Sequence, residues 1–298
     1  MDTDMTRSQV TWMPAVCLAL LCTLIFPTPT FAKGKTRLPR TPRTPAGTGT
    51  AGRTDLPIDA QPAWLDDVDT LDPGTASLEL SVNRWSTSDG GQTDGPVLDL
   101  AVGLTSQIQL SVSLPHYSAR YTDGYSASGR GDSYLALKVQ LLDPSDHRIG
   151  VSVEPLVEVL SDAAVSDPTL GLSRVNWGVP ITFQIGSDDT KTRAYTTAGY
   201  FSRHAAFWGG AVEYDASSAV TVIGTAMFST ATKRNASSDL LGLSGSRTDA
   251  TGMMYVSVTK TVSFFGALGR TISNRDQNGA RLIASVGVRV ETTRHPKP

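Results

Sequence analysis

The sequence predicts an all-β fold, a transmembrane antiparallel β-barrel of about 12 strands. Three observations support this fold class. From Ala76 onward, apolar and polar residues alternate with period two, which is typical of strands. The connections between these runs alternate in length, and charged residues fall on the face opposite the aliphatic one. We therefore expect one barrel over residues 76–293.

The first 32 residues resemble a secretory signal peptide. An apolar run from Ala15 to Phe26 follows Arg7 and precedes the small-residue site Thr30-Phe31-Ala32. The run is shorter than the roughly 20 apolar residues that a membrane-spanning helix needs. We expect cleavage after Ala32 and export to the bacterial outer membrane.

Residues 33–75 are predicted to be a disordered linker and lead-in to the first strand. Lys33 to Thr54 is basic and rich in Pro and Thr, with almost no apolar residue that could offset its ordering entropy. Four aspartates follow at the end of this stretch. They lack the spacing and the bidentate Glu of an EF-hand loop, so we interpret the cluster as a solvated turn: Asp66, Asp67, Asp69 and Asp72.

Twelve period-two runs follow. In Val97 to Leu104, for example, Leu98 and Leu100 share one face while Asp99 and Ala101 take the other. The runs lie near residues 76–86, 97–104, 107–118, 132–142, 148–160, 174–187, 191–203, 206–215, 219–229, 250–259, 262–272 and 281–291.

Loop lengths predict how the strands lie in the membrane. One set of connections is short and polar, as at Thr105-Ser106 and at Asp143 to His147. The other set is mostly longer and rich in Gly and Ser, as at Ser86 to Gly95 and Ser229 to Ala250. Short periplasmic turns and longer extracellular loops are typical of membrane barrels, and an even strand count places both termini on the periplasmic side.

A soluble β-sandwich is the alternative fold, but its core could not hold many charges without a severe desolvation cost. A barrel lumen is polar and can hold many charges. Either these charges line a conduit, where the acidic majority favours cations, or they pair across the lumen and close it. The predicted lumen-facing charges are Glu79, Asp99, Lys138, Glu154, Glu158, Glu213 and Arg289.

Three strand segments carry a family resemblance: Gly103 to Pro115, Gly129 to Asp143 and Asn176 to Gly186. With them the chain resembles the meta-pathway phenol-degradation family of outer-membrane proteins. The resemblance covers roughly residues 70–290 and implies a barrel transporter associated with aromatic-compound catabolism. It implies no particular functional residue.

Catalytic and metal-binding patterns are scarce. None of the four histidines has a metal-ligand spacing such as HExxH, and both cysteines lie in the predicted signal peptide, so we predict neither a metal site nor a cofactor. His116 and Ser118 share an outward face, as in the His-x-Ser arrangement of outer-membrane phospholipases, but no orienting Asn is evident. We do not predict an enzyme.

We expect passive transport of small solutes, apolar or aromatic ones among them, across the outer membrane. Either Tyr117 to Gly131 or Ser229 to Ala250 would form the gate. A structural or adhesive surface barrel is the alternative, and a lipid-modifying barrel enzyme is a third. The expected partners are outer-membrane lipid, the solute and the barrel-assembly machinery; a formal net charge of -2 gives no field that favours nucleic acid.

Overall fold

The computed structural model describes residues 65–87, 90–121, 124, 126–161, 165, 173–186, 190–233, 246–274 and 279–292. The predicted signal peptide and most of the predicted linker therefore lie outside the described residues. Within these residues, no helix is long and apolar enough to cross a membrane.

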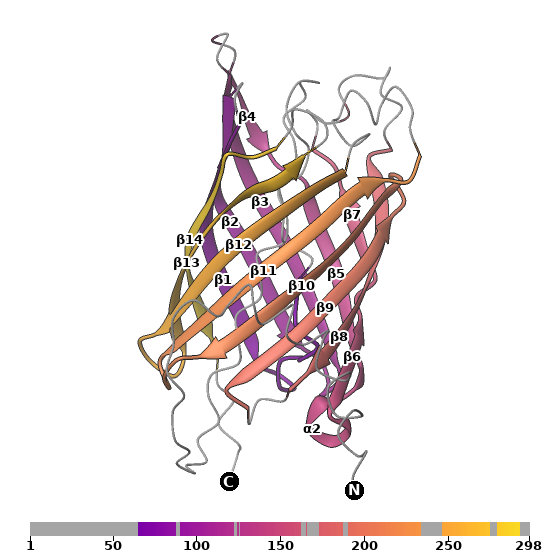
Figure 1. Cartoon of the computed structure of the whole chain (residues 1–298), viewed down its shortest axis with the longest axis vertical. Helices are drawn as coiled ribbons and strands as arrows, with labels where there is room; N and C mark the ends of the chain where they lie inside the picture. Colours follow the sequence, from indigo (N-terminus) through magenta and orange to yellow (C-terminus); the bar gives the residue numbers. More distant parts are fainter. Residues whose placement is uncertain are drawn as a thin grey trace, which may run out of the picture. The chain divides into compact units, whose positions relative to one another are not determined.

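The strands follow one another around the barrel wall (Figure 1). They are β1 (Ala76–Ser86), β2 (Gly90–Gly103), β3 (Ile108–Tyr121), β4 (Ser126–Arg130), β5 (Ser133–Leu142), β6 (Ile149–Val153), β7 (Leu156–Val159), β8 (Val175–Ile185), β9 (Thr192–Phe201), β10 (Ala205–Asp215), β11 (Val220–Ala231), β12 (Ser246–Ser257), β13 (Val262–Asn274) and β14 (Leu282–Glu291).

Two of the twelve barrel strands are interrupted. β6 and β7 pair with the same neighbours, β5 and β8, and are separated by Glu154 and Pro155. Proline has no amide to donate to the ladder, which explains the break. β4 and β5 both pair with β3 and are separated by Gly131 and Asp132. Each pair forms one strand of the wall, so the predicted number of twelve is confirmed.

The barrel closes between its first and last strands. β1 pairs with β14 antiparallel, from Ser77 opposite Glu291 to Ser86 opposite Leu282. The start of β1 and the end of β14 therefore lie at the same end of the barrel. Closure leaves no open sheet edge in the wall, which is the condition for strands to span a membrane.

Burial in this barrel is the reverse of that in a soluble protein. Leu80 on β1 and Leu135 on β5 are 46% and 49% exposed, whereas Lys138 and Glu158 are 1% and 0% exposed. The outward face is apolar and the buried face carries charge, which confirms the barrel and excludes the sandwich.

The ends of the barrel differ, and we call them the short-turn end and the long-loop end. At the short-turn end, the predicted turn after β5 is a single helical turn, α2 (Pro144–His147). Asp143 caps it, since its carboxylate accepts a hydrogen bond from the Ser145 amide at 2.8 Å. At the long-loop end, the predicted loop Ser86 to Gly95 is wrong, because β2 already begins at Gly90. Both faces of that segment are polar, so it lacks the alternation that marks a strand.

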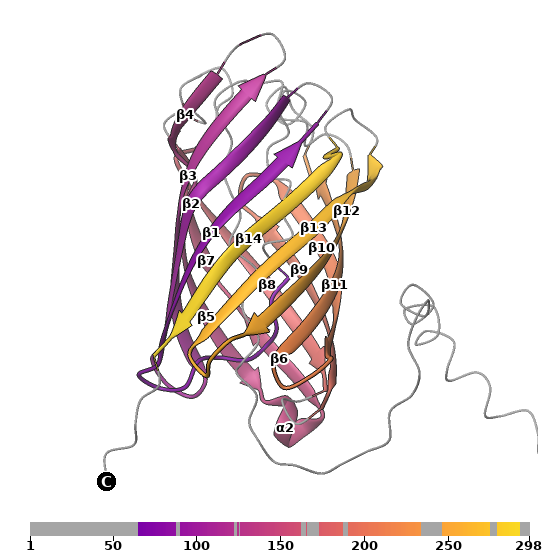
Figure 2. The ribbon, with the colours of Figure 1, turned by 90° about the vertical axis from the view of Figure 1, so that its left-hand side faces the viewer.

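β2, β3 and β4 extend beyond their neighbours at the long-loop end (Figure 2). β3 and β4 pair there, from His116 opposite Arg130 to Arg120 opposite Ser126. The region predicted as a gating loop, Tyr117 to Gly131, is therefore mostly a strand hairpin that projects from the barrel.

Candidate functional site in the barrel interior

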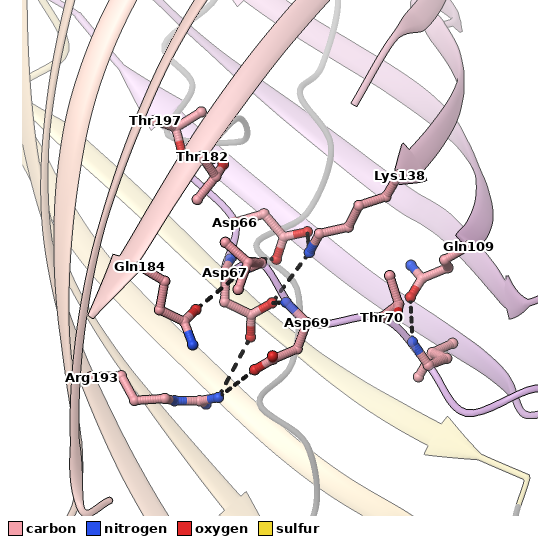
Figure 3. Close-up of polar contacts among 12 residues, drawn as sticks. Asp66, Asp67, Asp69, Thr70, Gln109, Lys138, Thr182, Gln184, Arg193 and Thr197 are labelled. Carbon is pink, nitrogen blue, oxygen red and sulfur yellow. Dashed lines mark hydrogen bonds and ion pairs between the residues drawn. The ribbon is translucent and has the colours of Figure 1, made fainter. Parts of the chain in front are cut away.

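A segment that precedes the first strand lies inside the barrel. We call residues 65–75 the plug segment. Leu65 and Val68 are fully buried, and Thr70 is 1% exposed. Figure 3 shows Asp66, Asp67 and Asp69 inside the ring of strands, between Lys138 and Arg193.

Ion pairs join the plug segment to the wall. Lys138 Nζ on β5 lies 2.9 Å from Asp66 Oδ2 and 3.2 Å from Asp67 Oδ1. Arg193 Nη1 on β9 lies 2.9 Å from Asp69 Oδ2. Both cations are almost completely buried, so their carboxylate partners offset a large desolvation cost. The aspartates thus neutralise the inner surface at two places on the wall.

Side chains of the wall also bind the backbone of the plug segment. The Val68 amide donates to Gln184 Oε1 at 3.1 Å, and the Leu71 amide donates to Gln109 Oε1 at 2.8 Å. The Thr70 hydroxyl donates to the Ser106 carbonyl at 2.7 Å. Buried amides need such partners, and here two glutamines of the barrel wall supply them.

The wall has room for the plug segment where it carries glycine. A Cβ atom at Gly150 would lie 2.4 Å from Val68 Cγ2, and one at Gly103 would lie 2.3 Å from the Leu71 carbonyl oxygen. Any other residue at these two positions would collide with the segment. The wall and the segment are therefore complementary in shape as well as in charge.

The prediction of a solvated turn is wrong for three of the four aspartates, whereas Asp72 is exposed and its carbonyl accepts a turn hydrogen bond from the Thr75 amide. Asp67 is 7% exposed and, like Asp66 and Asp69, makes an ion pair in the interior. These aspartates are buried because of contacts with residues that are distant in the sequence. The partners Lys138 and Arg193 lie far along the chain, and local spacing gives no sign of them.

The structure places the seven predicted charges in separate groups on the buried face. Arg289 Nε lies 3.6 Å from Glu79 Oε2 across the seam between β14 and β1. Asp99 on β2 is in register with Glu79 on its other side and is half-buried. Lys138 binds the plug segment, as described above.

The other three predicted charges lie apart from that seam. Glu158 accepts a hydrogen bond from the Tyr134 hydroxyl at 3.0 Å and lies 3.6 Å from Arg203 Nη1. Glu213 is in contact with Arg193. Glu154 is half-buried at the break between β6 and β7. That these charges line a solute path remains a prediction.

Sequence reasoning missed the two buried arginines Arg193 and Arg247, and the half-buried Arg203, whose side chain points inward to Glu158. Arg193 could have been found by counting alternate residues along its own strand. It shares the buried face with Tyr195, Thr197 and Phe201, while Ala194 and Ala198 lie on the other side. The inward face mixes aromatic and polar residues and the outward face is mostly Thr and Ala, so the usual contrast between aliphatic and polar residues is absent.

Apolar and aromatic side chains cover much of the remaining inner surface. One cluster includes the plug residue Leu65 together with Tyr134, Ala136, Leu156, Phe201, Phe207 and Met227. A second, formed by wall residues of β9 to β13, comprises Tyr195, Ala211, Ile223, Met253, Tyr255, Phe265 and Ala267. The Tyr255 and Phe265 rings lie 5.3 Å apart between centroids.

His116 and Ser118 both lie on the exposed outward face of β3. Among the hydrogen bonds of the described residues, none joins these two side chains. Within the part of the chain that the structure describes, no group of three His, Cys, Asp or Glu side chains could hold a metal ion. The other predicted gate, Ser229 to Ala250, is described only at its strand ends, and residues 234–245 lie outside the described residues.

Comparisons with known proteins bear on the fold. No family model matches the chain, and no curated protein matches its sequence. The COG4313 outer membrane channel from Pseudomonas putida F1 is similar in structure, with a TM-score of 0.54 and 13% identity over 78% of this chain and 100% of that one. The NanC porin has a TM-score of 0.51 and 13% identity over 72% of this chain and 98% of that one.

The chain folds as an outer-membrane β-barrel. Because both identities are low, the likeness shows the architecture alone. Membership of the meta-pathway phenol-degradation family remains a prediction.

Proposed function

We propose that this chain is an outer-membrane channel for the passive passage of small solutes, which the plug segment restricts at rest. The observation that carries the proposal is the set of ion pairs from Lys138 and Arg193 to three plug aspartates. Both cations belong to the barrel wall, whereas the aspartates belong to a segment outside the sheet. The segment can therefore leave while the wall stays intact.

The chemistry of these contacts suits a movable segment. Ion pairs and single hydrogen bonds can be exchanged for water or for a solute, whereas a fully apolar interface would resist hydration. Departure of the segment would open Lys138 and Arg193 to the lumen. The conduit would then carry the positive charge of Lys138 where the closed form is neutralised, while Arg193 would keep its wall partner Glu213.

Apolar or aromatic solutes form the proposed substrate class. The cluster around Tyr195, Tyr255 and Phe265 gives the inner wall ring faces and edges against which a planar solute can stack. The sequence resemblance to the phenol-degradation family favours the same class.

The orientation follows from the general architecture of such barrels. The short turns and the plug segment would face the periplasm and the long loops the exterior. Residues 1–32 would be removed as a signal peptide, and the barrel-assembly machinery would insert the barrel. The plug segment would then enter the lumen from the periplasmic side.

A disulfide lock tests the proposal. Val68 and Gly150 approach each other so closely that Val68→Cys with Gly150→Cys places two thiols within bonding reach. The chain's other two cysteines both lie in the predicted signal peptide. The measurement is uptake of phenyl glucoside and of glucose into liposomes that contain the purified protein, before and after reduction. Each single-cysteine variant is a matched control.

We expect the oxidised double variant to be the least permeable form and reduction to restore the uptake of the wild type. The single-cysteine variants should not respond to reduction. Equal uptake in the locked and reduced forms would show that solutes do not pass where the segment lies. Equal uptake of phenyl glucoside and glucose after reduction would reject the preference for aromatic solutes and leave the plug proposal intact.

A further inference from the structure

The outward face of the projecting strands carries a polar hollow of about 410 Å³. Two arginines and several hydroxyl groups line it, and no acidic side chain does. The polar side chains of its lining are Arg84, Thr93, Ser118, Arg120, Ser126 and Ser128. Guanidinium and hydroxyl donors without a carboxylate make a site for an anion with several oxygen atoms.

The neighbouring strand fixes where the Arg84 guanidinium lies. Arg84 Nη1 donates to Thr93 Oγ1 at 2.9 Å, so the side chain reaches from β1 onto β2. A Cβ atom at Gly91 would lie 2.8 Å from Arg84 Nη2, and Gly91 is in register with Arg120 on β3. The glycine therefore lets the Arg84 guanidinium lie across β2 on the side of Arg120.

The polar hollow lies just beyond the apolar band of the barrel. On β1 the exposed Leu80 and Val82 precede Arg84, and on β3 the exposed Leu114 precedes Ser118 and the exposed Arg120. The change from apolar to basic occurs on neighbouring strands at the long-loop end, where β2, β3 and β4 project (Figure 2). This is the level at which lipid headgroups meet a barrel.

A second, apolar hollow of about 580 Å³ shares Arg84 and extends across the outward wall from β1 to β11. It exists because small residues take the outward positions on three adjacent strands: Gly252, Gly266 and Ala284. Val82, Met254 and Leu268 stand at its sides. Its surface suits a hydrocarbon chain that lies against the wall.

We propose that the two hollows bind one phosphorylated glycolipid of the outer leaflet. A lipid phosphate lies between Arg84 and Arg120, where the hydroxyl groups of Thr93 and Ser118 also donate to it. An acyl chain of the same molecule fills the apolar hollow below Arg84. Clusters of basic residues next to an apolar surface attract anionic lipid through both charge and acyl burial.

The first test removes the charge. The full-length barrel, purified in detergent, is titrated with bisphosphorylated lipid A and, separately, with the same lipid after dephosphorylation, and bound lipid is counted by native mass spectrometry. Arg84→Ser with Arg120→Ser should weaken binding of the phosphorylated lipid roughly 30-fold. Lys191→Ser with Lys260→Ser removes two exposed cations from the short-turn end and should leave binding unchanged.

The second test fills the apolar hollow. Gly252→Leu keeps both arginines, so it should weaken binding of the phosphorylated lipid about threefold to tenfold through the lost acyl contact. Folding of each variant is checked by electrophoresis of unheated samples, in which a folded variant has the same mobility as the folded wild type.

Three results would overturn the proposal. The first is equal binding by wild type and the double arginine variant, and the second is equal binding of the phosphorylated and dephosphorylated lipids. The third is full displacement of the lipid by millimolar inorganic phosphate, which would reduce the polar hollow to a site for free anions.

Discussion

Lys138 and Arg289 are both buried cations on the inner face of the wall, but they obtain their counter-charges in different ways. Arg289 meets Glu79 across the seam between β14 and β1, so the wall neutralises itself there. Lys138 on β5 instead meets Asp66 and Asp67, which precede the first strand. In one region of the interior the wall supplies its own counter-charge, and in the other the plug segment supplies it.

This difference separates stability from gating. Charges paired within the wall hold neighbouring strands in register and have no need to move. Charges paired with the plug segment depend on a segment that forms no part of the sheet. Changes in the two regions should therefore affect different measurements.

Deletion of residues 65–72 should have the largest effect. The wall would keep its hydrogen-bonded strands, whereas Lys138 and Arg193 would lose their aspartate partners and become hydrated. Planar-bilayer recordings should change from brief or small openings to a steady, larger conductance. If the shortened barrel folds and conducts as the wild type does, the plug segment has no part in gating.

Replacement of Arg193 by Gln should have the next largest effect. Loss of one partner of a buried ion pair costs about 3–5 kcal/mol, and here the cost falls on the docked plug segment through Asp69 and on Glu213. Open time in bilayers should increase. Arg247→Gln is the matched control, because Arg247 pairs with Asp249 on its own strand. It should lower thermal stability and leave conductance unchanged.

A methyl group at Gly150 should act more weakly and through shape alone. Gly150→Ala places a Cβ atom against Val68, and such overpacking costs about 1–3 kcal/mol. Open time should increase slightly. The additional change Val68→Ala should restore the behaviour of the wild type, since it removes the colliding methyl groups. Failure of that rescue would indicate that the alanine disturbs the wall and not the segment.

The smallest effect on conductance is expected at the seam. Glu79→Gln leaves Arg289 with Glu291 at 3.8 Å as its remaining ion-pair partner on that strand pair. We expect a loss of about 1–3 kcal/mol in barrel stability, measured as a lower temperature for the electrophoretic mobility shift. A large rise in conductance from this change would contradict the division between the two regions.

The local pattern predicted the strands well because a barrel wall is a repetitive structure. Leu98 and Leu100 face outward because alternate side chains of a strand point to opposite faces, and this rule needs no knowledge of the neighbours. The rule failed where both faces are polar, as in Gly90 to Asp94 of β2. It was also incomplete on β9, where neither face is aliphatic and the pattern gives no sign that Arg193 is buried.

Spacing along single strands is enough to predict the class of fold and the separation of apolar and charged faces, and counting such runs predicts the number of barrel strands. The partners that neutralise the buried charges depend instead on contacts between distant parts of the chain. Asp66 and Lys138 are 72 residues apart in the chain and 2.9 Å apart in the barrel. Closure of β14 onto β1 creates the interior in which two such residues can meet, and no local pattern encodes that distance.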